Sequence, residues 1–258
     1  MIEARQIVAD LQSATSERRA RAPFTDEHPD LDVDTAYEAQ WISVQARLDA
    51  GETLVGAKLG LTSRAKQKVM SVDNPLYGWV TSDMLFPAED PVPLDRFIHP
   101  RVESEIAFLL GRDVETPATV TSVLAATEAV FGAVDILDSR YENFRFKLPD
   151  VVADNASAGG FILGPTTLGP TQVPDLRLVG CVVRVNGEVA ATAAGAAVMG
   201  HPAASVAWLA NKLAASKRRL QAGWLVFSGG LTEPFPLGPT GSVSFEFDGL
   251  GSIEVRGA

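Results

Sequence analysis

The spacing of hydrophobic and polar residues changes near residue 52. Before that point, apolar residues recur at helical intervals in residues 1–22, and a second helical pattern covers residues 34–51. Asp34 is the expected N-cap of this second helix, and Gly51 is its expected C-cap. The pattern therefore predicts a small helical region at the start of the chain.

Short apolar runs dominate the chain from residue 53 onward, and glycine and proline separate them. The predicted strands lie at residues 54–63, 78–81, 102–110, 132–137, 160–163, 178–185, 224–228, 242–247 and 252–255. Helices are expected at residues 63–69, 121–130 and 202–215. Because strands and helices do not alternate regularly, the pattern favours a β-rich barrel or sandwich over a doubly wound parallel sheet.

Length and charge narrow the class of protein. The chain has 258 residues and a net charge of −10, which suits one large domain and argues against a nucleic-acid-binding protein. Its charged N-terminal residues and the absence of any apolar run of about 18 residues predict a cytoplasmic protein that does not span a membrane. The single cysteine, Cys181, lies in an apolar run and is expected to be a buried structural thiol.

Two glutamates in the strand-like residues 101–110 are the first candidates for chemistry. Alternate residues of a strand share a face, so Glu103 and Glu105 point the same way as Ala107 and Leu109. Two buried carboxylates repel each other unless a cation lies between them, and such oxygen ligands suit Mg²⁺ or Mn²⁺. The alternative is a solvated strand face at a sheet edge.

Other polar residues have both a structural and a functional interpretation. Asp135 interrupts an apolar run, where an ionised carboxylate needs a partner or a metal. Lys58 lies in an apolar strand, either reaching solvent or facing an anion. Asp138 and Arg140 are close enough in sequence to pair, and residues 154–157 could form a simple turn. No nucleotide-binding loop and no Ser/His/Asp spacing is present.

Taken together, these segments resemble one family. Gly56-Ala-Lys-Leu-Gly-Leu-Thr-Ser63, Pro100-Arg-Val-Glu-Ser-Glu-Ile-Ala107 and the runs at 134–140 and 153–157 occur in order. Further matching runs lie at residues 186–188, 195–202, 206–211, 228–230 and 249–252. From about residue 35 to its end, the chain resembles the 4-oxalocrotonate decarboxylase and 2-oxopent-4-enoate hydratase branch of the fumarylacetoacetate hydrolase superfamily.

The resemblance implies a fold and a metal site. The fold would be α+β, a β-rich mixed roll at residues 53–258 after a helical region at residues 1–52. Glu103, Glu105 and Asp135 would bind Mg²⁺ or Mn²⁺. Relatives often carry glutamate at the third position, so the shorter Asp135 could hold the metal through a water. The resemblance also implies a homo-oligomer.

The resemblance assigns further site residues. Lys58 matches the family's active-site lysine, and Asp154 and Ser157 are expected to be catalytic beside it. Substrate-binding roles are expected for Leu59, Arg140 and Asn155.

The expected reaction is the metal-dependent decarboxylation of 2-oxo-3-hexenedioate (4-oxalocrotonate), a small 2-oxo dicarboxylic acid from meta-cleavage of aromatic rings. Residues 138–146 resemble the decarboxylases, whereas residues 156–164 would also suit a hydratase. The alternatives are therefore a 2-oxopent-4-enoate hydratase and an inactive structural subunit. C–C bond hydrolysis is disfavoured because no histidine–glutamate dyad is evident. A hydratase paralogue is a possible partner of the decarboxylase.

Overall fold

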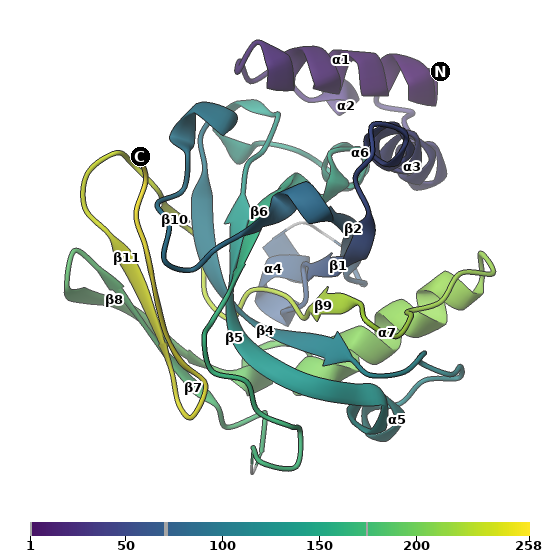
Figure 1. Cartoon of the computed structure of the whole chain (residues 1–258). Coiled ribbons are helices and arrows are strands. Elements are labelled where there is room, and N and C mark those ends of the chain that lie inside the picture. Colours follow the sequence, from purple (N-terminus) through teal and green to yellow (C-terminus); the bar gives the residue numbers. More distant parts are fainter. Residues whose placement is uncertain (1, 70–71, 174) are drawn as a thin grey trace.

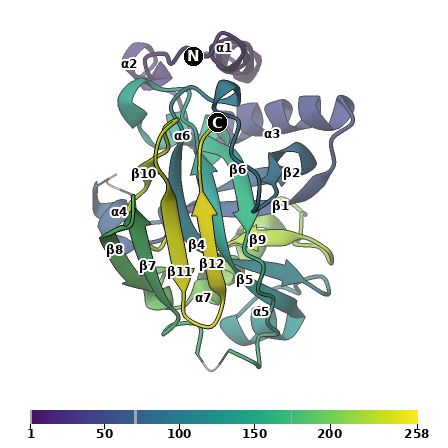
Figure 2. The same ribbon diagram turned by 60° about the vertical axis from the view of Figure 1, so that its left-hand side comes forward.

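The computed structural model describes residues 2–69, 72–173 and 175–258. A strongly curved sheet forms the centre of the molecule, and its strands run in the order β2-β1-β9-β4-β5-β6-β3, with β10 paired to β4. A second sheet, in the order β12-β11-β7-β8, lies across β4 and β5 of the first (Figures 1 and 2). The fold is thus the β-rich α+β roll that the resemblance implies.

The helices and strands have the following bounds. The α-helices are α1 (Ala4–Ser16), α2 (Phe24–Glu27), α3 (Val33–Asp49), α4 (Arg64–Val69), α5 (Val120–Ala126), α6 (Leu148–Ala153) and α7 (Pro202–Ala214). The 3₁₀ turns are η1 (Ser82–Met84), η2 (Leu94–Arg96), η3 (Glu142–Phe144), η4 (Asn155–Ser157) and η5 (Gly195–Ala197). The strands are β1 (Leu54–Gly60), β2 (Leu76–Thr81), β3 (Leu85–Phe86), β4 (Arg101–Leu110), β5 (Thr127–Leu137), β6 (Ala158–Leu163), β7 (Gly180–Val185), β8 (Glu188–Ala194), β9 (Leu225–Phe227), β10 (Phe235–Pro236), β11 (Val243–Phe247) and β12 (Gly251–Val255).

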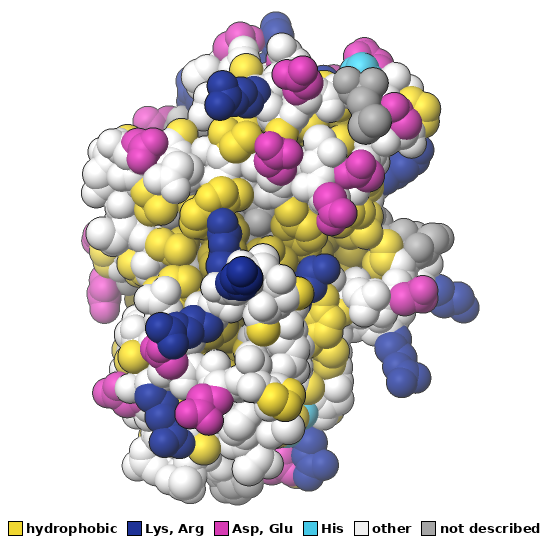
Figure 3. All heavy atoms as spheres, turned by 90° about the vertical axis from the view of Figure 1, so that its right-hand side faces the viewer, with side chains coloured by type: hydrophobic (Ala, Val, Ile, Leu, Met, Phe, Trp, Pro, Cys, Tyr) yellow, Lys and Arg dark blue, Asp and Glu magenta, His cyan; other side chains and the backbone are white. Residues whose placement is uncertain are grey.

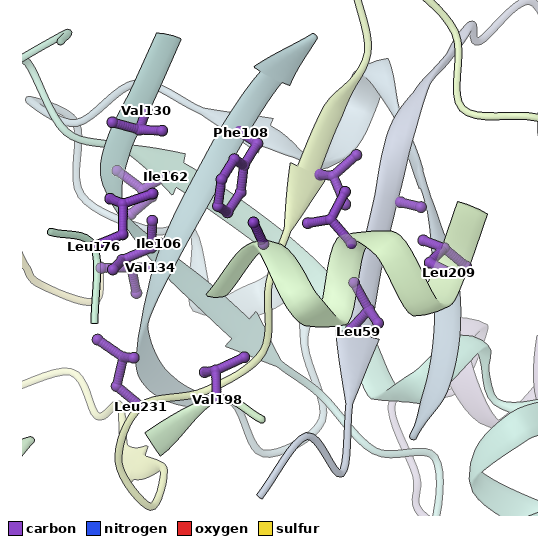
Figure 4. Packing of buried hydrophobic residues seen from close by; sticks show 14 of the residues in the cluster. Leu59, Ile106, Phe108, Val130, Val134, Ile162, Leu176, Val198, Leu209 and Leu231 are labelled. Atoms are coloured by element: carbon purple, nitrogen blue, oxygen red, sulfur yellow. The ribbon is translucent and has the colours of Figure 1, made fainter. Parts of the chain in front are cut away.

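The main hydrophobic core fills one face of the large sheet. Alternate residues of β4 and β5, such as Ile106, Phe108 and Val134, point into it, and α7 covers the neighbouring strands with Leu209 (Figure 4). Burying these side chains contributes roughly 1.5–3 kcal/mol each, which holds the strands in one register. The opposite face of the sheet carries a smaller hydrophobic cluster, which includes Ala107 and Phe227, and next to it the polar residues of the site.

The N-terminal helices share a second core with residues much later in the chain. Ile7 and Leu11 of α1 and Ala36 and Ala39 of α3 pack with α6, and these helices lie together at one end of the molecule (Figure 1). Gln40 of α3 ties this end to the sheet, because its Nε2 donates to Tyr77 O and to Val152 O, both at 2.9 Å. The division at residue 52 remains a prediction.

Most of the predicted elements are present, with two corrections. The helix expected at residues 121–130 ends at Ala126, because the β-branched and aromatic residues that follow pair as β5. The N-cap of α3 is Asp32, whose side chain accepts from Thr35 N at 2.7 Å, and not Asp34. Cys181 is buried as expected, and burial raises the pKa of its thiol to about 11. Among the described residues, no helix is long and apolar enough to cross a membrane.

Candidate metal centre and active site

The predicted carboxylates come together on the sheet face opposite the main core. Glu103 of β4 lies directly across the antiparallel ladder from Asp135 of β5, and Glu105 follows two residues along on the same face. Carboxylate oxygens of the three residues lie within 4.8 Å of one another. Glu103 is 5% exposed and the other two are fully buried. The solvated-edge interpretation of this strand is wrong, because β4 lies between β9 and β5.

Lys58 joins this cluster from β1. The register pairs Lys58 with Phe227 of β9, and Phe227 with Ala107 of β4, so the lysine shares the face of the glutamates. The side chain is 1% exposed; it forms an ion pair with Asp135, and its Nζ donates to Ala156 O at 3.1 Å. Burial alone would lower the pKa of Lys58, but the surrounding carboxylates raise it above its ordinary value, so the ammonium stays charged.

Glu105 gives the strongest evidence that the cluster suits a cation. One of its oxygens accepts from Gly229 N at 2.7 Å. Its other oxygen, Oε1, is buried and has no hydrogen-bond partner among the described residues. Burial and the neighbouring Asp135 raise the pKa of Glu105 well above its ordinary value, although Lys58 opposes them. A divalent cation among these oxygens would satisfy Oε1 and favour the ionised form, so the donor set fits Mg²⁺ or Mn²⁺.

A glycine loop after β9 closes the cluster. A Cβ added to Gly230 would lie 2.2 Å from Glu103 Oε2, so the backbone passes directly against that carboxylate. Gly229 has a φ of +109° and packs against the side chain of Thr62. No functional role was predicted for these glycines, although residues 228–230 are one of the runs that carry the family resemblance. The signal was the Gly-Gly pair itself, which marks a close backbone approach.

A pocket opens over the cluster. Its cavity volume is about 320 Å³, enough for a small organic acid. The lining residues are Lys58, Gly60, Leu61, Leu76, Arg101, Glu103, Leu137, Phe144, Phe146, Val151, Ala156, Ser157, Glu233 and Pro234.

Backbone strain concentrates around this pocket. The three residues of η4, Asn155, Ala156 and Ser157, have φ values of 49°, 56° and 55°, and the pocket residues Leu61 and Phe144 both have a φ of 55°. A left-handed backbone conformation costs roughly 1–2 kcal/mol for each residue other than glycine, and such residues are typical of functional sites. The η4 turn aims Ala156 O at Lys58 and brings Ser157 to the pocket wall. Ser157 Oγ is buried without a hydrogen-bond partner in the described structure.

The remaining polar residues of this region hold the strained turn. The Asp154 carboxylate forms an ion pair with Arg140, and Arg140 Nη2 donates to Asp154 O at 2.7 Å. Arg140 thus pairs with Asp154 and not with Asp138, which instead accepts from the backbone N–H groups of residues 98 and 99. Burial outweighs the guanidinium and raises the pKa of Asp154 to about 6. Neither Asp154 nor Arg140 lines the pocket.

Asn155 and Leu59 also face away from the pocket. The Asn155 side chain bonds the backbone of Trp79, accepting from its N at 2.8 Å and donating to its O at 2.9 Å. Leu59 follows Lys58 in β1, so its side chain points to the opposite face and packs in the main core beside α7 (Figure 4). A substrate-binding role for the Leu59 side chain therefore finds no support in the structure, because the alternation of the strand turns it to the wrong face.

Comparison with known proteins agrees with this architecture. Residues 48–256 match the family model of the fumarylacetoacetate (FAA) hydrolase C-terminal domain. The chain belongs to this family. It is 42% identical to a 4-oxalocrotonate decarboxylase of Pseudomonas sp. (strain CF600), over 90% of this chain and 88% of that protein. A 2-keto-4-pentenoate hydratase of Paraburkholderia xenovorans (strain LB400) is 38% identical, over 95% of this chain and 91% of the relative.

A solved structure of this fumarylacetoacetate hydrolase family superposes over the whole chain. It is the 4-oxalocrotonate decarboxylase from Pseudomonas putida G7, complexed with magnesium and adipate, with a TM-score of 0.93 and 36% identity. The match covers 100% of this chain and 99% of the solved one. The chain's named relatives are thus decarboxylases and hydratases, as the motifs predicted.

Proposed function

We propose that this chain is a metal-dependent decarboxylase that converts 2-oxo-3-hexenedioate to 2-hydroxypenta-2,4-dienoate and CO₂. The observation that carries the proposal is the buried cluster of three carboxylates beside a buried lysine, in a pocket that fits a small diacid. The higher identity to a 4-oxalocrotonate decarboxylase, 42% against 38% to a 2-keto-4-pentenoate hydratase, and the match to a solved decarboxylase structure support the choice of reaction.

Glu103, Glu105 and Asp135 would hold Mg²⁺ or Mn²⁺. When bound, the ion supplies a Lewis acid for the C1 carboxylate and C2 keto oxygens of the substrate. Asp135 would serve both the ion and Lys58, because its carboxylate already pairs with the ammonium. No organic cofactor is needed, since the conjugated ketone of the substrate accepts the electrons.

The reaction moves one electron pair along the substrate. The C5–C6 bond breaks, CO₂ leaves, and the pair forms the C4–C5 double bond while the existing double bond shifts to C2–C3. Negative charge then collects on the C2 oxygen, and a proton on that oxygen completes the product. Lys58 has three N–H groups, of which two are directed to Asp135 and Ala156 O. The third would stabilise the oxyanion, and Ser157 Oγ would hydrogen-bond the adjacent carboxylate.

The roles we propose for Asp154, Arg140 and Asn155 are in positioning. Their side chains bond to one another or to backbone, and they hold the η4 turn that carries Ala156 and Ser157. They would therefore act on turnover only through the placement of Lys58 and Ser157.

A hydratase is the second candidate, because hydratases of several kinds are 35–41% identical to the chain. It would use the same carboxylates and lysine but add water to 2-hydroxypenta-2,4-dienoate. An inactive structural subunit is disfavoured by the intact carboxylate–lysine cluster.

The test is a spectrophotometric assay with Mg²⁺ that offers 2-oxo-3-hexenedioate and 2-hydroxypenta-2,4-dienoate separately and traps CO₂. CO₂ release from the first compound supports the proposal. Consumption of the second without CO₂ supports the hydratase, and no reaction with either supports the inactive subunit. Glu103→Gln should abolish turnover while the circular dichroism spectrum stays unchanged.

We also propose a homo-oligomer in the cytoplasm, with a hydratase paralogue as a possible partner. Large apolar side chains lie exposed on the surface, including Leu178 at 72% and Val189 at 55% exposure. On another face, hydrophobic side chains gather in a band below the N-terminal helices (Figure 3). Exposed apolar surface of this kind favours association, and light scattering combined with size-exclusion chromatography would measure it.

A further inference from the structure

Arg101 lines the pocket from the strand that carries the carboxylates. The register places Lys58 level with Ala107, six residues further along β4, so the two basic residues enter the pocket from different levels of the sheet. In β4, Arg101 is two residues before Glu103, so both side chains lie on the same face of the sheet. Two residues of strand span about 6.6–6.8 Å. The distance along β4 between Arg101 and Glu103 is therefore similar to the length of a six-carbon diacid, whose terminal carboxyl carbons lie about 6 Å apart when the chain is extended.

The guanidinium group of Arg101 is held in place without a carboxylate partner. Its central carbon lies 4.1 Å from the centroid of the Phe144 ring, and the His99 ring also contacts Phe144, with 4.8 Å between the ring centroids. Among the described residues, the Arg101 guanidinium has no ion pair or hydrogen bond. Several other arginines of the chain pair with acids, as in Arg47–Glu52, Arg145–Asp26 and Arg184–Glu246.

The backbone also constrains this arrangement. Phe144 has a φ of 55°, a strained backbone value that is typical of functional sites, and its ring contacts both Arg101 and His99. An arginine stacked on a fixed ring keeps its planar fork free for a bidentate contact with a carboxylate. The unsatisfied fork therefore faces the pocket that it lines.

We propose that Arg101 recognises the distal carboxylate of a dicarboxylic 2-oxo acid and so determines the substrate specificity of this site. The inference rests on the proposed function for the identity of the substrate. Lys58 and the carboxylate cluster bind the keto-acid end, which a decarboxylase substrate and a hydratase substrate share. Arg101 binds the end where 2-oxo-3-hexenedioate and 2-hydroxypenta-2,4-dienoate differ, since only the first has a second carboxylate.

Arg101 also orients the bond that breaks. A carboxylate held by a planar fork cannot rotate freely about the C5–C6 bond, and the electron pair of that bond must align with the conjugated system as CO₂ leaves. Arg101 is thus a binding residue for the leaving carboxylate, and the apolar side chains around it, Phe144 and Phe146, exclude water from this end.

The experiment measures binding of two non-reacting analogues to the Mg²⁺-loaded protein by isothermal titration calorimetry. 2-Oxohexanedioate has both carboxylates but lacks the double bond that accepts electrons, and 2-oxohexanoate lacks the distal carboxylate. Arg101→Met should weaken binding of the diacid roughly 10- to 100-fold and leave binding of the monoacid nearly unchanged. Arg101→Lys should retain part of the diacid affinity, because it keeps the charge but loses the fork and the stacking.

The matched control is Arg19→Met, because Arg19 is exposed and pairs only with Glu17 on the surface. It should bind both analogues as the wild type does. Equal weakening of both analogues in Arg101→Met, or no weakening of the diacid, overturns the inference. Absence of CO₂ release from 2-oxo-3-hexenedioate would instead count against the proposed reaction, and the binding preference for the diacid would still test Arg101.

Discussion

Substitution of Gly230 by alanine tests whether the glycine loop and the carboxylate cluster form one metal site. The added Cβ would lie 2.2 Å from Glu103 Oε2 and 2.4 Å from its Cδ, whereas real Cβ contacts are essentially never under 3.0 Å. The Glu103 carboxylate must therefore move by about 1 Å. Magnesium requires oxygen ligands at about 2.0–2.1 Å in near-ideal geometry, so such a shift removes Glu103 from its position as a ligand.

The expected effect falls on metal affinity more than on folding. The atoms that must move are the end of a flexible side chain, so the free energy of unfolding of the metal-free protein should change by only about 1 kcal/mol. Affinity for Mn²⁺, measured by calorimetric titration, should fall roughly 10- to 100-fold. Turnover should fall with it and recover partly at high metal concentration.

Gly180→Ala is the matched control, because a Cβ at Gly180 meets nothing within 4 Å. It should bind Mn²⁺ as the wild type does. If Gly230→Ala binds Mn²⁺ with wild-type affinity, Glu103 is not a metal ligand and the cluster is not the metal site.

Three further substitutions separate the charged groups of the site. Lys58→Met should lower kcat roughly 10²- to 10³-fold. Without metal, thermal unfolding should show a loss of about 3–5 kcal/mol of stability, because the buried carboxylates lose their counter-charge, and Mg²⁺ should restore part of it. A metal-free variant as stable as the wild type would contradict this. Arg140→Met leaves Asp154 buried without its counter-charge, so its folded pKa rises further above the unfolded value. The folded state then binds more protons than the unfolded chain. The substitution should therefore lower the free energy of unfolding by about 3 kcal/mol at pH 8 and by less as the pH falls toward 5. Urea titrations that give the same decrease in the free energy of unfolding at both pH values would refute this reasoning. Ser157→Ala removes a hydroxyl that has no partner among the described residues, so stability should hold while kcat/KM falls roughly 10-fold; unchanged kinetics would exclude Ser157 from substrate binding.

The carboxylate cluster could be predicted from the sequence because it depends on strand geometry alone. Alternation placed Glu103 and Glu105 on one face, and that face became apolar two residues later, which indicated burial. Asp135 lies in an apolar run, but its position opposite Glu103 depends on the register of β4 and β5. The pattern of apolar and polar residues does not predict that register. The resemblance supplied that link.

The pocket walls could not be predicted in the same way. Arg101 and Phe144 are 43 residues apart in the chain and meet only because β4 passes the η3 turn. The Asp154–Arg140 pair was missed because Asp138 is nearer to Arg140 in sequence, and the strained η4 turn, which brings Asp154 within reach, has no glycine to signal it. Residues 188–194 were not expected to form a strand because their alanines have low β-propensity; pairing with β7 overrides it.

The two ends of the pocket are built by different means, and this difference bears on specificity. At the keto-acid end, Lys58, Glu103, Glu105 and Asp135 are fixed by hydrogen-bonded strand ladders, so their spacing is rigid. At the other end, Arg101 is also held in β4, but the Phe144 ring on which it stacks stands on an irregular turn that can change without disturbing the sheet. The two candidate substrates, 2-oxo-3-hexenedioate and 2-hydroxypenta-2,4-dienoate, are alike where they meet the ladders and differ where they meet the turn. Selection between the two reactions should therefore depend on Arg101 and the turn segment beside it, while the carboxylate–lysine cluster supports either chemistry.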